Sequence, residues 1–421
     1  MKSAIEYMRG WLTALTAFGL AACGSSDAVQ PMAADTASTD TLRHRLLRNA
    51  AIRHGLVAPS QLEVPGHPLR RGVGEQLFKA ELLSLNSRIS CQSCHLDRFS
   101  SADGLPNGIG VGGEGEGHDR LRSGGLIVPR NVLPLWGRGS HGFDTLFWDG
   151  KVQRTEAGIV SQFGHLVPSN DPLEVAAHLP FVELREMILD TQDIRRTLAA
   201  EQVDAANRVY EVLADRVRRD AGLGPALARA YGIRVADIRF GHIAGAVAEF
   251  IRHRFRIRPT RLHRFVFENR PISVRELRGG IVFYGKGRCA SCHGGPYFTD
   301  FQFHGVAFPQ AGFGRNGFGV DLGRYNVTFE PQDRYKFRTP PLYNVTRTAP
   351  YSHSGSVSDL SQAIVYHFDP LRFMEPQRMS GAERAEEYRR LGVAARDTLP
   401  TSLSDEEVQD LVAFLGMLEF D

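Results

Sequence analysis

The residues best suited to chemistry are two short motifs in which two cysteines and a histidine stand at a fixed spacing. They are Cys91-Gln92-Ser93-Cys94-His95 and Cys289-Ala290-Ser291-Cys292-His293. At this spacing both thiols can bond to the vinyl groups of one haem, and the adjacent histidine becomes the proximal ligand of its iron. The sequence therefore predicts two covalently attached c-type haems, with His95 and His293 as iron ligands.

Paired cysteines also serve other chemistries. In an exported protein a C-x-x-C pair can be a redox disulfide or, with a nearby histidine, part of a zinc site. Both pairs in this chain are followed directly by histidine, and of the five cysteines only Cys23 lies outside them. No disulfide framework remains, and the repeated pattern favours haem over both alternatives.

The N-terminus indicates export. Basic residues precede an apolar run, residues 11–22, that is too short for a stable membrane span. We therefore predict a signal peptide over residues 1–22. Residues 23–40 are mostly small and polar and are predicted to form a flexible tether.

The end of this signal resembles a bacterial lipoprotein signal. It reads Leu20-Ala21-Ala22-Cys23, and the sulfur of Cys23 is the expected lipidation site. A cleaved signal with a chance cysteine is the alternative. Gly24 at the next position resembles lipoproteins sorted to the outer membrane. We expect the protein on the periplasmic side of a Gram-negative outer membrane, attached by lipid alone.

Composition sets broad limits. The chain has 421 residues, 42% of them apolar, which is enough for two or three domains. Its 50 basic and 47 acidic residues nearly cancel, so net charge gives no case for nucleic acid as a partner.

One stretch of the chain is locally basic. It is either a solvated face whose arginines also pair with haem propionates, or a docking patch for an anionic partner. It contains Arg252, Arg254, Arg256, Arg258, Arg261 and Arg264.

The chain contains a diverged internal repeat. Gly74-Glu75-Gln76-Leu77-Phe78 precedes the first motif, and Gly279-Gly280-Ile281-Val282-Phe283 precedes the second. Helix-length periodicity covers residues 189–248, whereas residues 100–140 and 296–326 are glycine-rich and irregular. We expect a mainly α fold of two cytochrome c-like haem domains with long irregular loops, residues 41–270 and 271–421.

Two helices of the C-terminal domain have clear start signals. Ser273 and Glu276 form a capping box before the second motif, and Ser404 and Glu407 form another near the C-terminus. Apolar residues follow one face of the latter helix, which we expect to close the second haem pocket. They are Val408, Leu411, Val412, Leu415 and Leu418.

Further motifs make the sequence resemble the bacterial dihaem cytochrome c peroxidase and MauG superfamily over nearly the whole mature chain. In chain order they are Ser90 to His95, Pro129-Arg130-Asn131, Phe147-Trp148-Asp149-Gly150, Asp321-Leu322-Gly323-Arg324, Phe337-Arg338-Thr339-Pro340 and Thr348 to Gly355. The resemblance implies unequal roles for the two haems, because the sixth ligand decides whether an iron is open or closed.

For the second haem, the position that holds the axial Met or Tyr of the family is His367 in this chain. Its spacing from Leu360, Ala363 and Ile364 places His367 on the apolar face of a helix, where a histidine is also a common core residue. The resemblance implies a His293/His367 ligand pair. Met374 and Met379 are fallback ligands.

For the first haem, the removable distal histidine of the classical peroxidases is replaced by Ser123. The resemblance then implies that the His95 haem is five-coordinate at rest. His118 or His178 as sixth ligand would instead give a closed resting state.

The family also suggests catalytic residues. The segment from His178 to Glu186 resembles the distal stretch of the family, so Glu186 is the candidate general acid and base for peroxide, with His178 in the same pocket. An ordinary exposed glutamate is the alternative. Trp148 matches the tryptophan between the haems, where an indole can carry an oxidising equivalent, although it also fits a core aromatic.

The remaining family positions concern binding. The side chain of Asn131 and the backbone carbonyls of Thr348 and Pro350 match a calcium site between the domains. Arg338 and His353 resemble residues that bind haem propionates.

Together these features predict an oxidoreductase that reduces hydrogen peroxide at the His95 haem, with electrons relayed by the second haem. A small periplasmic cytochrome c or cupredoxin is the expected donor. The alternatives are a MauG-like oxidation of a partner protein or small substrate, and a non-catalytic dihaem carrier or sensor. A homodimer is left open.

Overall fold

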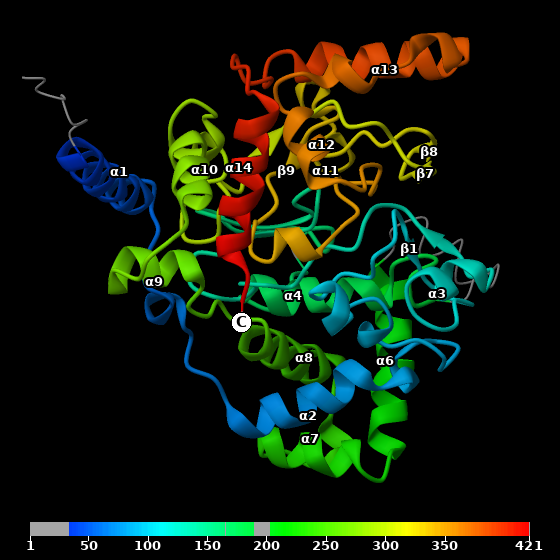
Figure 1. The fold of residues 1–421 in the computed structure, drawn as a ribbon. Helices are drawn as coiled ribbons and strands as arrows, with labels where there is room; N and C mark the ends of the chain where they lie inside the picture. Colours follow the sequence, from blue (N-terminus) through cyan, green and yellow to red (C-terminus); the bar gives the residue numbers. More distant parts are fainter. Residues whose placement is uncertain (1–32, 165, 189–202, 421) are drawn as a thin grey trace, which may run out of the picture. The chain divides into compact units, whose positions relative to one another are not determined.

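Each cysteine motif follows a helix that crosses a second helix from later in the same predicted haem domain (Figure 1). In the computed structural model, α2 (Pro68–Lys79) packs on α8 (Phe240–Arg254), and α10 (Val274–Tyr284) packs on α14 (Asp405–Leu415). The motif cysteines then begin short 3₁₀ turns at Cys91–Ser93 and Cys289–Ser291. The predicted internal repeat is therefore a repeated pair of crossing helices.

Glycine makes both crossings close. A Cβ atom on Gly74 would lie 1.9 Å from the carbonyl oxygen of Ala246, and one on Gly279 would lie 1.9 Å from that of Asp410. Only a residue without a side chain allows the two backbones to approach so closely. The glycine that opens each lead-in sequence thus sets the position of the helix before each haem motif.

The described residues are 33–164, 166–188 and 203–420. Their remaining α-helices are α1 (Ala33–Arg53), α3 (His118–Arg122), α4 (Pro172–His178), α6 (Val203–Arg219), α7 (Leu223–Tyr231), α9 (Arg261–Glu268), α11 (Tyr325–Thr328), α12 (Leu360–Val365) and α13 (Gly381–Ala394). The fold is mainly α, as predicted. Helices α6, α7 and α8 account for the periodicity of residues 203–248; residues 189–202 lie outside the described residues.

The strands are short and antiparallel. They form the sheets β1–β2 (Gly108–Ile109, Ile127–Val128), β3–β4–β5 (Thr145–Leu146, Val152–Thr155, Gly158–Ser161), β6–β9 (Phe303–His304, Phe337–Arg338) and β7–β8 (Phe313–Gly314, Gly317–Phe318). The pairs β1–β2 and β7–β8 and strand β6 lie in the glycine-rich stretches 100–140 and 296–326, which also contain the one-turn helix α3 and are otherwise mostly irregular, as expected. Phe303 pairs with Arg338 in the β6–β9 ribbon.

Both predicted capping boxes are confirmed. The backbone N–H of Glu276 donates to the Ser273 hydroxyl at 3.2 Å, and that of Ser273 donates to the Glu276 carboxylate at 2.7 Å. Ser404 and Glu407 exchange the same bonds at 3.2 and 2.8 Å. On α14, Val408, Leu411 and Leu415 are buried, as the apolar face requires.

Residues 43–421 form one compact unit that contains both motifs, and residues 1–42 form another. The boundary at residue 270 stays a prediction. Helix α1 begins at Ala33, so residues 33–40 of the predicted tether are helical, consistent with the alanines among them. The predicted signal peptide and Cys23 lie outside the described residues. Within those residues, no helix has the length and apolar character needed to span a bilayer.

Candidate functional site: two haem pockets

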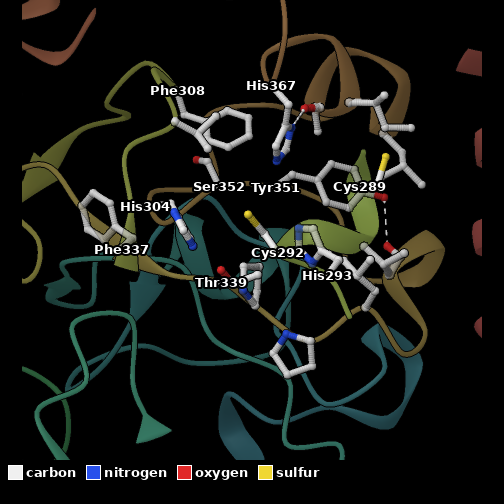
Figure 2. A pocket seen from close by; sticks show the side chains of 18 of the residues that line it. Cys289, Cys292, His293, His304, Phe308, Phe337, Thr339, Tyr351, Ser352 and His367 are labelled. Atoms are coloured by element: carbon white, nitrogen blue, oxygen red, sulfur yellow. Dashed lines mark hydrogen bonds between the residues drawn. The ribbon is translucent and has the colours of Figure 1, made fainter. Parts of the chain in front are cut away.

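The second motif opens into a cavity that also receives His367 (Figure 2). His293 and His367 point toward one another with ring centroids 6.3 Å apart. Their Nδ1 atoms donate to the carbonyl oxygens of Phe298, at 3.0 Å, and Ala363, at 2.8 Å. These bonds fix both tautomers and leave both Nε2 atoms available as ligands.

This arrangement fits a haem iron. Imidazole nitrogens bind such metal ions at about 2.0 Å, which separates the centroids of two opposed rings by roughly 6 Å. Burial lowers the pKa of His293 to about 4, helped by His367, so the ring is neutral as an iron ligand must be. Met374 and Met379 are absent from the cavity lining, whereas Leu411 and Leu415 of α14 line it as predicted. The geometry supports His367 over both methionines.

Arg338 provides a cation inside the same cavity wall. Its side chain is fully buried, and Nε donates to the carbonyl of Phe147 at 2.9 Å. One terminal nitrogen has no hydrogen-bond partner among the described residues. A buried, partly unsatisfied guanidinium fits an anionic haem propionate, which supports the role implied for Arg338.

His353 lines the cavity too, but its own partners are protein groups. Its Nε2 lies 2.9 Å from the Gln310 amide oxygen, and its ring stacks on Phe337 with centroids 3.8 Å apart. Burial lowers the pKa of His353 to about 3. The ring is therefore neutral, and its predicted contact with a propionate stays a prediction.

The first motif is held in a similar way. His95 Nδ1 donates to the carbonyl of Ser101 at 2.8 Å, and burial lowers the pKa of His95 to about 4. The Cys94 sulfur lies 3.8 Å from the carbonyl oxygen of Ile109. At the next residue, a Cβ on Gly110 would lie 1.8 Å from the Arg185 carbonyl. Gly110 thus brings the segment that contains Glu186 close to the first motif.

Glu186 is half-buried near both cysteines of this motif, since its charge contributes to raising the pKa of each thiol. Burial raises the pKa of Glu186 to about 7, and the neighbouring carboxylate of Glu183 adds to this rise. A carboxyl with a pKa near neutrality can both hold and release a proton. The location and the pKa support its predicted role.

Glu183 is a neighbour that the sequence did not reveal. Its carboxylate accepts from Lys151 Nζ at 2.8 Å, and Arg315 lies 3.4 Å away. Burial opposes ionisation, but these two cations outweigh it and lower the pKa of Glu183 to about 2. Two nearby carboxyls with widely separated pKa values often mark an acid–base site. No local sequence pattern marks Glu183, because its partners Lys151 and Arg315 lie 32 and 132 residues away in the chain.

The other predicted distal residues lie in different settings. His178 is buried among aromatic rings, with centroids 5.3 Å from Phe240 and 5.5 Å from Tyr210, and its Nδ1 donates to the Glu174 carbonyl. These contacts are typical of a core histidine. His118 is exposed on α3, and the Ser123 hydroxyl donates to the Arg120 carbonyl.

Trp148 lines the second cavity and is also linked to the residues expected for calcium. Its indole N–H donates to the Asn131 carbonyl at 2.9 Å, while its own carbonyl accepts from Arg338 N–H at 2.7 Å. The Asn131 amide donates to the Pro350 carbonyl at 2.6 Å, and Thr348 lines the same cavity. The structure therefore places Asn131 and Pro350 in contact beside Trp148, with Thr348 in the lining of the same cavity.

The basic stretch is largely paired within the molecule. Arg252 forms ion pairs with Asp171 and Glu249, Arg254 with Asp97, and Arg261 with Glu276. These contacts favour the structural interpretation over a docking patch.

A second group missed from the sequence is Cys292, Asp300 and His304, whose ligand atoms lie within 4.8 Å of one another. The His304 Nε2–Asp300 distance is 2.8 Å. Such a group can hold a metal ion, but the Cys292 sulfur belongs to the haem motif. Figure 2 shows His304 beside that sulfur. We therefore assign His304 and Asp300 to the edge of the haem pocket.

The fold and the two histidine sites define a protein built to hold two c-type haems in one chain. Residues 70–270 match the family model described as di-haem cytochrome c peroxidase. Over these residues the chain is similar to the di-haem cytochrome c peroxidases.

The chain is similar to proteins of both branches suggested by its motifs. It is 26% identical over 416 residues to the methylamine utilization protein MauG of Methylorubrum extorquens, covering 96% of this chain and 94% of the relative. It is 26% identical over 316 residues to the cytochrome c551 peroxidase of Pseudomonas aeruginosa, covering 73% and 75%. The diheme peroxidase BthA of Burkholderia thailandensis shares the fold, with a TM-score of 0.61, 21% identity and 87% and 89% coverage.

Proposed function

We propose that the protein reduces hydrogen peroxide at the His95 site and receives electrons through the His293/His367 site. The match of residues 70–270 to the di-haem cytochrome c peroxidase model and the similarity to a cytochrome c551 peroxidase support this activity. The observation that carries it is Glu186, a half-buried carboxyl with a pKa of about 7 beside the first cysteine motif. The haems, when bound, supply the exchange of electrons with peroxide.

Glu186 handles the protons. Cleavage of hydrogen peroxide to two waters consumes two electrons and two protons, and it requires that a proton leave one oxygen and reach the other. Ionised Glu186 accepts the first proton at its carboxylate and returns it to the departing oxygen. Lys151 and Arg315 hold Glu183 ionised, and that charge keeps the Glu186 carboxyl basic enough for this exchange.

The sixth ligand separates the two sites. His367 is opposed to His293 and would close that site, which then serves electron transfer. At the first site Ser123 replaces the removable histidine and His118 is exposed, so we propose that the His95 haem is open at rest. Trp148, with bonds to both halves of the chain, is the proposed path for electrons.

The test is Glu186→Gln, with the exposed Glu156→Gln as matched control. Stopped-flow absorption would follow the reaction of the ferric protein with peroxide. We expect the peroxide step to slow by about 10²- to 10⁴-fold in E186Q, with both haems attached, and to be unchanged in E156Q. An unchanged rate in E186Q would remove Glu186 from the mechanism.

A MauG-like oxidation of a partner protein or small substrate is the second candidate. Its support is the similarity to MauG over 96% of this chain. The two activities can be distinguished by mixing the protein with peroxide and a reduced small cytochrome c or cupredoxin. Only the peroxidase activity oxidises such a donor catalytically.

Three finer features belong to the same proposal. The Asn131 side chain and the carbonyls of Thr348 and Pro350 would bind one calcium ion, with water completing its oxygen ligands. The protein would act on the periplasmic side, and lipid on Cys23 would anchor it to the outer membrane. Mass spectrometry of the mature N-terminus tests the anchor, and calorimetric titration with Ca²⁺ tests the ion.

A further inference from the structure

Two buried arginines lie on the same phenyl ring. The guanidinium carbon of Arg138 is 5.9 Å from the ring centroid of Phe143, and that of Arg338 is 6.0 Å from it. Arg138 is 5% exposed and Arg338 0%. Phe143 itself packs against Tyr297 and Phe301, which follow the second haem motif. The two buried cations thus share one aromatic neighbour, and the charge of Arg138 reaches Arg338, whose pKa it helps to lower.

Neither cation is neutralised by the protein. Within the described ranges, no carboxylate lies within ion-pair distance of Arg138 or Arg338, and Arg138 donates only from Nε, to the Pro134 carbonyl at 3.1 Å. Burial lowers the pKa of Arg138 to about 10 and that of Arg338, with the help of Arg138, to about 9. Both groups therefore stay charged at neutral pH. Buried charges of one sign require a bound partner of the other sign.

Each arginine is connected to a different motif. The loop of Arg138 is bound to the loop of His95, because Leu135 N–H donates to the Ser101 hydroxyl at 2.8 Å while the Ser101 carbonyl accepts from His95. The Arg138 charge also reaches His95, whose pKa it lowers in addition to burial. Arg338, by contrast, lines the cavity of His293 and His367. The pair therefore spans the two haem sites.

We propose that Arg138 binds a propionate of the first haem, and that it forms a paired anion site between the two haem motifs with Arg338, where the second-haem propionate is already expected. Arg138 lies outside the family motifs quoted above and is a positioning residue. Its charge stabilises the reduced form of the first haem, because a nearby cation favours the state with the more negative charge. This inference rests on the presence of two haems and is independent of peroxide chemistry.

Potentiometric titration of the purified dihaem protein tests the proposal, with each haem followed by its own spectrum. Arg138→Gln should lower the reduction potential of the His95 haem by about 59 mV or more. For one electron this is a tenfold or larger fall in the equilibrium constant for reduction. Arg338→Gln should act mainly on the second haem. Arg122→Gln, which removes an exposed cation of α3, is the matched control and should change neither.

Arg138→Lys keeps the charge and is the second variant if R138Q does not accumulate. The R138K variant should keep a reduction potential of the His95 haem close to that of the unmodified protein. It should shift the resonance Raman band of haem propionate bending, since lysine lacks the planar fork of arginine. If R138Q or R138K has the same haem reduction potentials and the same propionate band as R122Q, the assignment is overturned. A shift that appears only with added chloride or phosphate would assign the site to a free anion and likewise overturn it.

Discussion

Arg130 donates from Nε to Asp321 at 2.7 Å and from a terminal nitrogen to Asp149 at 2.6 Å, in a buried group. The three residues come from three separate motifs, and Asp149 directly follows Trp148. Asp321 lies 191 residues from Arg130 in the chain. This contact joins the two haem-bearing halves at the place where electrons are proposed to pass.

Loss of this group should destabilise the protein strongly. Arg130→Met leaves two buried carboxylates without their main partner, and we expect the free energy of unfolding to fall by about 3–5 kcal/mol. Arg154→Met removes a half-exposed pair with Asp144 and should cost less than about 1 kcal/mol. Urea denaturation followed by circular dichroism measures both values, and equal effects would contradict the special role of Arg130.

The same group predicts sensitivity to acid. Burial opposes ionisation of Asp149 and Asp321, but Arg130 outweighs it and lowers the pKa of both below the unfolded value. Their stabilisation is then complete above about pH 4 and is lost as pH falls further. Thermal unfolding at stepwise lower pH should show this loss, and it should be smaller in R130M. An equal acid loss in R130M would contradict the assignment.

Gly74 gives a test of the repeated helix crossing. Gly74→Ala places a methyl group against the Ala246 carbonyl and should destabilise the protein by about 1–3 kcal/mol. Gly72→Ala lies in the same helix with no atom within 4 Å of the new Cβ, and should instead stabilise by about 0.5–1 kcal/mol. The comparison of the two unfolding free energies isolates the crossing from helix propensity.

His367→Ala should change the second haem only. Without the ring opposite His293, that haem should lose its low-spin spectrum while the His95 haem keeps its own. Met374→Leu and Met379→Leu should leave both spectra unchanged, because neither methionine lines the cavity. A normal low-spin spectrum in H367A would instead point to one of the methionines.

The peroxide step should depend on pH through Glu186. The ionised carboxylate is the form that accepts the first proton, so the rate should rise with pH and level off above a pKa of about 7. The inflection should disappear in E186Q. Glu183→Gln removes a neighbouring negative charge, so the inflection should move to lower pH in that variant.

Much of this account follows from local sequence. The cysteine motifs, the capping boxes at Ser273 and Ser404 and the helix before His367 depend on residues a few positions apart, and short-range rules describe them. Arg138, Glu183 and Lys151 could not be recognised in this way. Their importance comes from burial and from partners that only the tertiary structure brings close, such as Arg315 beside Glu183.

Electron paramagnetic resonance of the resting ferric protein, before and after peroxide is added without a reductant, tests the central claim most directly. An open His95 haem beside Glu186 predicts a high-spin signal that is lost at once on mixing, alongside a low-spin signal from the His293/His367 site. Two low-spin signals that peroxide leaves unchanged would contradict the account and favour an electron carrier or sensor.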